Sequence, residues 1–229
     1  MPVRKKAPED LTAKKALALE VIRRLKAEYP DAGCTLDYDH AWQLLVSVRL
    51  AAQCTDARVN IVVEELFAKY PSVAALAAAE PEDIEAIVKP CGLGHSKARD
   101  ISACMRMLRD KYDCRVPNTF EELLALPGVG RKRANLIMGE VFGKPAIVTV
   151  THFIRLFNKI GLVDGIKEPQ KVEMALWKII PPEEGSDLCH RFVMHGRAVC
   201  NARKPECEEC CLKDICRTAR EAAGQQAEP

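Results

Sequence analysis

Four cysteines in the last thirty residues have the type and spacing of a metal-binding set. Cys200, Cys207, Cys210 and Cys216 form a C-x6-C-x2-C-x5-C run. Thiolates at such short intervals can surround one centre, as they do in zinc sites and in iron–sulfur clusters. The unequal spacing differs from the paired C-x2-C knuckles of structural zinc and favours a cluster, with zinc as the alternative. Cys211 is expected to point away from this centre.

A glycine-rich connection at residues 126–135, which reads LPGVGRKRAN, has the features of a phosphate-binding turn. Glycine lets the backbone approach an anion closely, and the amides at a helix start bind anions without reading bases. Basic residues are disfavoured at a helix N-terminus, so three in succession suggest an anionic ligand. An ordinary tight turn is the alternative. The expected phosphate contacts are Gly128, Val129, Gly130, Arg131 and Arg133.

Lys132 is the candidate nucleophile of this connection. A lysine at a helix start with an arginine on each side is expected to have a lowered pKa, which leaves more of its amine neutral. A neutral amine attacks carbonyl carbons. The local sequence leaves open a second role, as a further phosphate contact.

The composition predicts a soluble all-α protein of a reducing, intracellular compartment. The chain has 229 residues, 48% of them apolar, eleven cysteines and a net charge of +2, which by itself does not indicate nucleic acid. The sequence shows no apolar leader and no run of eighteen apolar residues, so we do not expect a membrane protein.

Apolar residues recur at steps of three and four, and predict about ten or eleven short helices. The residues from 217 to the end are expected to fray. The clearest stripes include Val21, Ile22 and Leu25, then Val59, Val62 and Leu66, then Ile101, Met105 and Leu108. Helices are expected to start near Asp39, after Ser72, at Pro81, after Thr119, at Arg131, after Thr151, at Pro169 and after Ser186.

The turn and the cysteine run, in this order, resemble the endonuclease III family of the helix-hairpin-helix DNA glycosylase superfamily. The resemblance extends from residue 18 to residue 216 and includes AAQCTD at 51–56, GLGHSKA at 92–98 and HGR at 195–197. It implies a six-helix barrel domain at 34–144, with the helix-hairpin-helix at about 119–142. It also implies a cluster domain made of 1–33 and 145–229, which holds a 4Fe-4S cluster on the four cysteines.

The resemblance further implies a base-excision-repair glycosylase and AP lyase acting on double-stranded DNA with oxidised pyrimidines or abasic sites. Lys132 matches the lysine that forms a Schiff base with C1′ of a flipped-out nucleotide. Gln53 and Leu93 match the residues that fill and wedge the base stack. Other expected DNA contacts are His152, Arg197, Arg203 and Lys204, with Arg191 in the same basic segment. A monomer in the bacterial or archaeal cytoplasm is the simplest expectation.

Val150 departs from the family pattern, because the family has an aspartate two residues before His152. That carboxylate is expected to stabilise positive charge on the sugar as the base leaves, which valine cannot do. Base excision is therefore expected to be impaired, while Schiff-base formation at an existing abasic site persists. Val150 is either a natural divergence or a deliberate inactivating substitution.

Two other functions share these features. The first is a DNA- or lesion-binding protein without catalysis, in which Lys132 contacts a phosphate and the cluster is structural. The second is an adenine-mismatch glycosylase, a group that shares the fold and the cluster but lacks the hairpin lysine.

Overall fold

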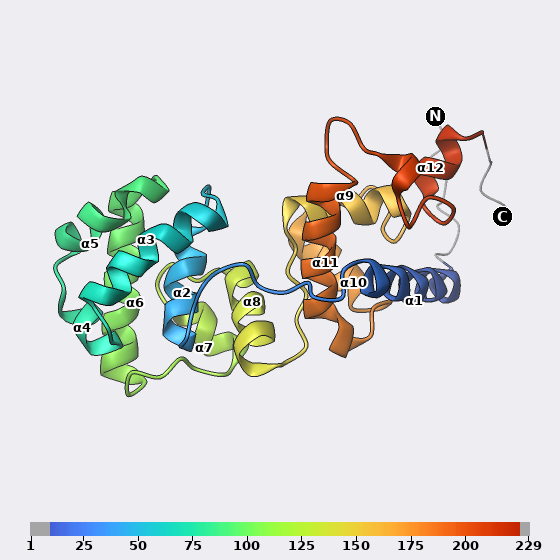
Figure 1. Cartoon of the computed structure of the whole chain (residues 1–229). Coiled ribbons are helices and arrows are strands. Elements are labelled where there is room, and N and C mark those ends of the chain that lie inside the picture. Colours follow the sequence, from blue (N-terminus) through green and yellow to red (C-terminus); the bar gives the residue numbers. More distant parts are fainter. Residues whose placement is uncertain (1–9, 225–229) are drawn as a thin grey trace, which may run out of the picture. The chain divides into compact units, whose positions relative to one another are not determined.

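The computed structural model describes residues 10–224, and within them it confirms an all-α fold without strands (Figure 1). The twelve α-helices of this part are α1 (Leu11–Glu28), α2 (Ala41–Leu50), α3 (Asp56–Lys69), α4 (Val73–Ala78), α5 (Pro81–Val88), α6 (Gly94–Lys111), α7 (Phe120–Ala125), α8 (Arg131–Phe142), α9 (Thr151–Ile160), α10 (Pro169–Leu176), α11 (Gly185–Ala198) and α12 (Arg217–Ala222). Three short 3-10 helices accompany them, η1 (Lys89–Cys91), η2 (Pro182–Glu184) and η3 (Cys207–Glu209).

The chain divides into two compact units. Residues 34–144 form the internal unit, which contains α2 to α8, and the two ends of the chain form the terminal unit, which contains α1 and α9 to α12. In the internal unit, α6 packs along α4 and α5, while α2 packs on α8. Fully buried leucines and isoleucines from these helices fill one core; they include Leu44, Leu66, Leu76, Ile84 and Leu108.

The terminal unit joins the first helix of the chain to the last hundred residues. Phe153 and Phe157 of α9 pack against Phe192 of α11, with ring centroids 5.5 and 4.6 Å from that of Phe192. Three ion pairs attach α1 to other segments of this unit: Lys14 Nζ lies 2.6 Å from Asp164 Oδ2, Arg24 Nη2 lies 2.9 Å from Asp214 Oδ2, and Lys26 Nζ lies 2.5 Å from Glu184 Oε1. These contacts hold segments that are distant in sequence in one unit.

The predicted helix starts agree with the structure to within about two residues. Thr55, Ser72 and Thr119 cap α3, α4 and α7 by accepting a hydrogen bond from a backbone amide, and proline opens α5 and α10. No described helix has the length and apolar character needed to cross a membrane.

The expectation that the chain frays from residue 217 is wrong for Arg217–Ala222, which form α12. Arg217 Nη2 donates to the carbonyl of Asn158 at 2.7 Å, and its Nη1 pairs with Asp164. Thr218 Oγ1 donates to the carbonyl of Lys159 at 2.9 Å. These contacts to the end of α9 order a polar segment that has no apolar stripe. Residues 225–229 lie outside the described part of the chain.

Candidate nucleic-acid interface and cysteine centre

The glycine turn lies between α7 and α8 in the internal unit. Gly128 has φ +74°, and a Cβ built on it would lie 2.9 Å from Cβ of Asp100. Both the backbone conformation and the close approach therefore require glycine at this position. Gly130 is the N-cap of α8, and its carbonyl accepts from the amides of Arg133 and Ala134 at 2.9 and 3.0 Å. The turn thus ends in a regular helix N-terminus, where backbone donors suit an anion.

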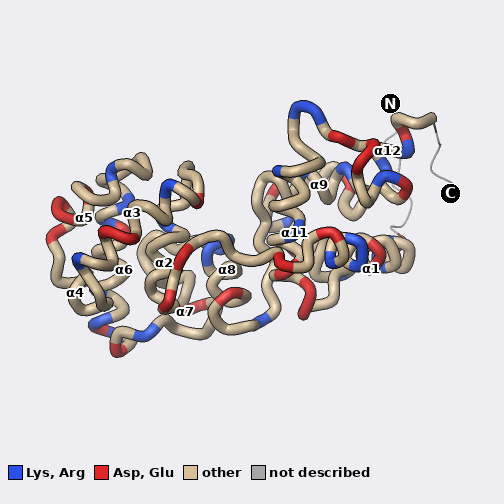
Figure 2. The backbone as a smooth tube through the Cα atoms, viewed as in Figure 1, with Lys and Arg blue, Asp and Glu red and all other residues tan. Residues whose placement is uncertain are grey.

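The arginines on each side of Lys132 have different local partners. Arg133 Nη1 donates back to the carbonyl of Gly128, so this side chain closes the turn. The Arg131 guanidinium carbon lies 5.0 Å from the ring centroid of Phe120, in a cation–π arrangement. Figure 2 shows basic residues at the start of α8. The protein itself therefore fixes the two arginines beside the candidate nucleophile.

The pKa of Lys132 is lowered from its ordinary value, as the sequence predicts, although for a partly different reason. Desolvation near the side chain is the larger cause, and the positive charge of Arg133 is the second. Lys132 as a whole residue remains exposed. The amine is therefore more often neutral than that of an ordinary lysine, and the residue that carries it is exposed.

Gln53 and Leu93 share an unusual backbone conformation. Each is exposed, and each has a left-handed backbone, with φ 57° and 53°. Such a conformation costs a non-glycine residue roughly 1–2 kcal/mol. Leu93 is 56% exposed at the N-cap of α6, and Gln53 lies in the turn after α2. Strained residues that project into solvent on two adjoining loops are typical of a binding surface.

Arg49 and Asp100 form a support behind the glycine turn that the sequence did not predict. Arg49 Nε donates to Asp100 Oδ2 at 2.8 Å, and Arg49 Nη2 donates to Ser96 Oγ at 3.0 Å. Arg49 is thus held by α6, and Asp100 packs where a Gly128 side chain would be. Only the packing of α2 on α6 brings this arginine and this aspartate together.

Val150 lies in the terminal unit, at the N-cap of α9. Its carbonyl accepts from the amide of Ile154 at 3.0 Å, but no side-chain hydrogen bond caps the helix. Asp, Asn, Ser and Thr are the favoured residues at such a position because their side chains accept from the first free amides. With valine at this position, the first free amides of α9 receive no hydrogen bond from the N-cap side chain. His152, in the first turn, packs against Gly196 of α11, and burial, Arg155 and Arg197 lower its pKa.

The basic segment around the cysteines is only partly available to a ligand. Arg203 and Lys204 are exposed on the loop between the first two cysteines, and Figure 2 shows the positive charge there. Arg191 is a correction, because it is 6% exposed, donates to the carbonyl of Tyr29 and pairs with Asp187. Arg191 lies on the buried side of α11. Arg197 remains exposed on the same helix.

Arg155 positions this loop, although no motif in the sequence marks this residue. Its Nη2 donates to the carbonyl of Cys200 at 2.5 Å, and its Nη1 donates to that of Asn201 at 3.3 Å. At the other end of the loop, the amide of Glu206 donates to the carbonyl of Val199 at 3.0 Å. The protein therefore closes the loop at its base and leaves its basic tip exposed.

All four predicted cysteines line one pocket of the terminal unit, together with Lys159, Val199, Pro205, Glu206, Thr218 and Ala219. The amide of Leu212 donates to Cys210 Sγ at 3.4 Å, and Arg155 Nη1 lies 3.8 Å from Cys200 Sγ. His195 is buried, with Nε2 3.4 Å from Cys210 Sγ and Nδ1 3.1 Å from the Tyr29 hydroxyl. Cys211 does not line this pocket.

In residues 10–224, no group of three or more His, Cys, Asp or Glu side chains is arranged to hold a metal ion. One zinc ion would draw every sulfur to about 2.3 Å. A cluster instead holds each cysteine on a different iron, so its ligands stand further apart. The four thiols around one pocket, with nitrogen donors directed at two of them, are a donor set that can hold an iron–sulfur cluster.

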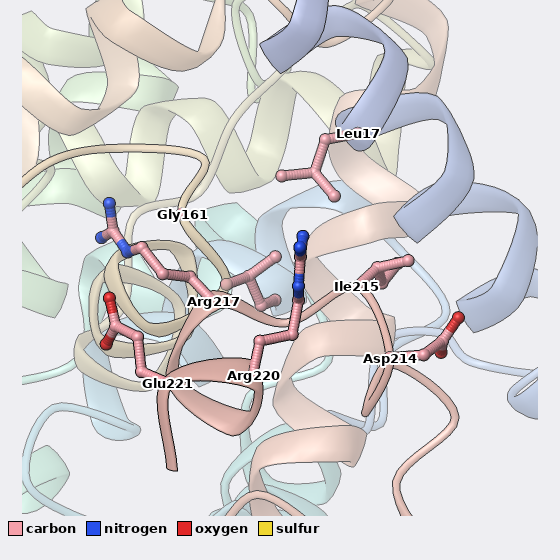
Figure 3. Close-up of a pocket in the computed structure, with 8 residues that line it drawn as sticks. Leu17, Gly161, Asp214, Ile215, Arg217, Arg220 and Glu221 are labelled. Carbon is pink, nitrogen blue, oxygen red and sulfur yellow. The ribbon is translucent and has the colours of Figure 1, made fainter. Parts of the chain in front are cut away.

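Another pocket, of about 330 Å³, lies between α1, the end of α9 and α12 (Figure 3). Leu17, Gly161, Ile215 and Arg220 are among its lining residues. It contains none of the residues that the sequence analysis selected.

Comparison with known proteins agrees with these features. Residues 46–182 match the model of the HhH-GPD superfamily base excision DNA repair proteins. The chain is 43% identical to endonuclease III of Synechocystis over 211 residues, 92% of this chain and 96% of that protein. A non-covalent endonuclease III–DNA complex is 38% identical, with a TM-score of 0.85 over 92% of this chain and 99% of the other. A trapped endonuclease III–DNA covalent intermediate is 39% identical, also with a TM-score of 0.85, over 91% and 98%.

Proposed function

Because the chain belongs to the HhH-GPD superfamily of base excision DNA repair proteins, we propose that it cleaves DNA at abasic sites through a Schiff base on Lys132. We further propose that its removal of oxidised pyrimidines is impaired by Val150. The observation that carries the proposal is Lys132 itself, an exposed lysine of lowered pKa in the first turn of α8, directly after the glycine turn. The relative solved as a covalent intermediate with DNA supports the same chemistry.

In the proposed lyase reaction, the neutral amine of Lys132 adds to the C1′ aldehyde carbon of an abasic sugar, and water leaves as the imine forms. The imine makes a proton on C2′ acidic. Its removal by a base breaks the C3′–O bond, and the 3′ phosphate leaves with the bonding electrons. The amides at the start of α8 would hold a neighbouring phosphate during these steps.

For the sugar to reach Lys132, the nucleotide must leave the base stack. Gln53 and Leu93 are proposed to occupy the space that it vacates. Their exposure and their left-handed backbones support this role, because a side chain that enters the base stack must project from a firmly held loop.

We propose that Cys200, Cys207, Cys210 and Cys216 hold a 4Fe-4S cluster, which makes the terminal unit the iron–sulfur domain. When bound, the cluster cross-links the pocket that these cysteines line. Purified protein is expected to be brown and to contain iron and acid-labile sulfide in equal amounts. Stoichiometric zinc in a colourless protein would contradict this assignment.

Borohydride trapping tests the proposed function on two duplexes, one with an abasic site and one with thymine glycol. A covalent adduct on the abasic duplex alone is expected, because only the second duplex requires the base to depart. Adducts on both at similar rates would show that another group replaces the missing aspartate. Specific binding without an adduct on either duplex would favour the second candidate, a lesion-binding protein, which the valine at position 150 supports.

The rate of adduct formation on the abasic duplex is expected to rise with pH and level off below the ordinary lysine pKa of about 10.4. Desolvation lowers the pKa of Lys132, and the nucleophile is the deprotonated form, so the plateau begins earlier than for a free lysine. Arg133→Gln removes the second cause and is expected to move the plateau to higher pH. A plateau that Arg133→Gln leaves unmoved would contradict the charge effect.

The loop tip is expected to contact phosphates, so the salt dependence of DNA binding measures its role. Each phosphate contact contributes about 0.9 to the slope of log affinity against log salt. Arg203→Ala with Lys204→Ala is expected to reduce the slope by about 1.8. The matched control is Arg23→Ala with Lys171→Ala, two exposed cations of the same unit that pair with Glu20 and Glu168. An equal reduction in both double variants would exclude a specific role for the loop.

A further inference from the structure

Lys97 is a fully buried lysine that the proposed reaction does not use. Its exposed fraction is 0%, and its Nζ donates to the carbonyls of Leu50 at 2.7 Å and Cys91 at 2.8 Å. Lysine is almost never fully buried unless its charge is paired. Here the ammonium donates to two backbone oxygens rather than to a carboxylate, so its burial calls for a reason.

The two carbonyls belong to the ends of two different helices. Leu50 is the last residue of α2, and Cys91 is the last residue of η1. Carbonyls at a helix end have no partner within their own helix. The chain enters the turn of Gln53 directly after the first carbonyl, and the turn of Leu93 directly after the second.

The turns that follow these helix ends contain Gln53 and Leu93, two of the four non-glycine residues with positive φ in the described part of the chain; the other two are Asp113 and Cys114. A strained backbone persists only where its surroundings hold it in place. Within the first turn, the amide of Cys54 donates to the carbonyl of Ala51 at 3.2 Å, and within the second, the amide of Gly92 donates to that of Lys89 at 3.0 Å. Lys97 adds the connection between the turns.

Building on the proposed function, we propose that Lys97 is a positioning residue whose ammonium joins the two wedge turns, so that Gln53 and Leu93 enter the base stack as one rigid unit. Bonds from an ammonium to carbonyls are stronger than neutral hydrogen bonds, and burial strengthens them further. One cation between two loops fixes their separation, which must match the space left by a single nucleotide. Loops held independently would insert less often together.

The surroundings of Lys97 act on the charge of its amine in opposite directions. Burial lowers its pKa, and the positive charges of Arg49 and Arg133 act in the same direction, while Cys91 and Cys54 oppose the shift. The bonds to the two carbonyls favour the charged form.

Lys97→Met tests the proposal, because methionine keeps an unbranched side chain as far as Cε and removes the ammonium with its donors. The readout is the fluorescence of 2-aminopurine next to a tetrahydrofuran abasic analogue in duplex DNA, which rises when the stack opens. We expect the Lys97→Met variant to open the base stack roughly ten- to a hundredfold less than the wild-type protein, which is the loss expected for charge-assisted hydrogen bonds. The ratio of borohydride adduct on duplex to that on single-stranded abasic DNA is expected to fall with it.

Arg106→Met is the matched control. Arg106 lies on the same helix, α6, and its guanidinium also donates to two backbone carbonyls, those of Ala77 at 3.2 Å and Ala79 at 3.5 Å. These carbonyls belong to the end of α4, away from both wedge turns in sequence. Arg106→Met is expected to lower stability without changing opening. Equal opening by wild type and Lys97→Met, or an equal loss in Arg106→Met, would overturn the proposal.

Amide exchange in the wild-type protein without DNA tests the clamp even if Lys97→Met does not fold. If the Lys97 ammonium holds both turns, breaking its hydrogen bonds to the two carbonyls frees both turns at once. The amides of Cys54 and Gly92 are therefore expected to exchange with the same free energy of local opening. Clearly different values would overturn the clamp. A wild-type protein that neither opens the duplex nor forms an adduct would refute the proposed function, whereas matched exchange in that protein would still support the clamp.

Discussion

Val150→Asp is expected to raise the rate of thymine glycol excision by about 10²–10⁴-fold, the usual contribution of a positioned acid–base group. The resemblance to the endonuclease III family implies an aspartate at this position, and a carboxylate stabilises the positive charge that develops on the sugar. The adduct on a ready-made abasic duplex should change much less. Single-turnover rates on the two duplexes measure the difference.

The position of Val150 at the N-cap of α9 supplies a matched control. Aspartate and asparagine cap helices about equally well, and a good cap contributes about 0.5–2 kcal/mol. Both Val150→Asp and Val150→Asn are therefore expected to raise the free energy of unfolding. Only Val150→Asp restores a negative charge, so only it should raise the excision rate.

Two outcomes would contradict this account of Val150. Equal excision by Val150→Asp and Val150→Asn would attribute any gain to the helix cap. No gain from either variant would mean that the carboxylate alone does not limit base removal.

Lys132→Gln is expected to abolish the borohydride adduct on every abasic substrate, because an amide nitrogen does not form an imine. Binding to the abasic duplex should persist, since the turn glycines and Arg133 remain. The control is Lys144→Gln, which changes a lysine shortly after the other end of α8 whose Nζ donates to the carbonyl of Asn118. Lys144→Gln is expected to form the adduct at the wild-type rate.

An adduct that survives in Lys132→Gln would assign the nucleophile to another amine. Loss of the adduct together with all binding would instead mean that Lys132 mainly contacts phosphate. Anisotropy measurements with the same duplex separate these results.

Much of the fold was predictable because its signals are local. Apolar stripes at helical spacing, capping residues such as Ser72 and Thr119, and prolines at helix starts all act within one or two turns of the chain. The glycine turn is equally local, since a positive φ at Gly128 depends on the residue itself. For this reason the sequence analysis selected these features correctly.

The sequence by itself determined the all-α fold, the glycine turn with its lysine, and the four cysteines that line one pocket. Only the tertiary structure decided which charged side chains are available. It buried Arg191 and Lys97, paired Arg49 with Asp100, and used Arg155 and Arg217 to hold distant segments. Local spacing sets backbone conformation, whereas the partner of a long charged side chain depends on which helices pack together, and that is fixed only by the assembled core.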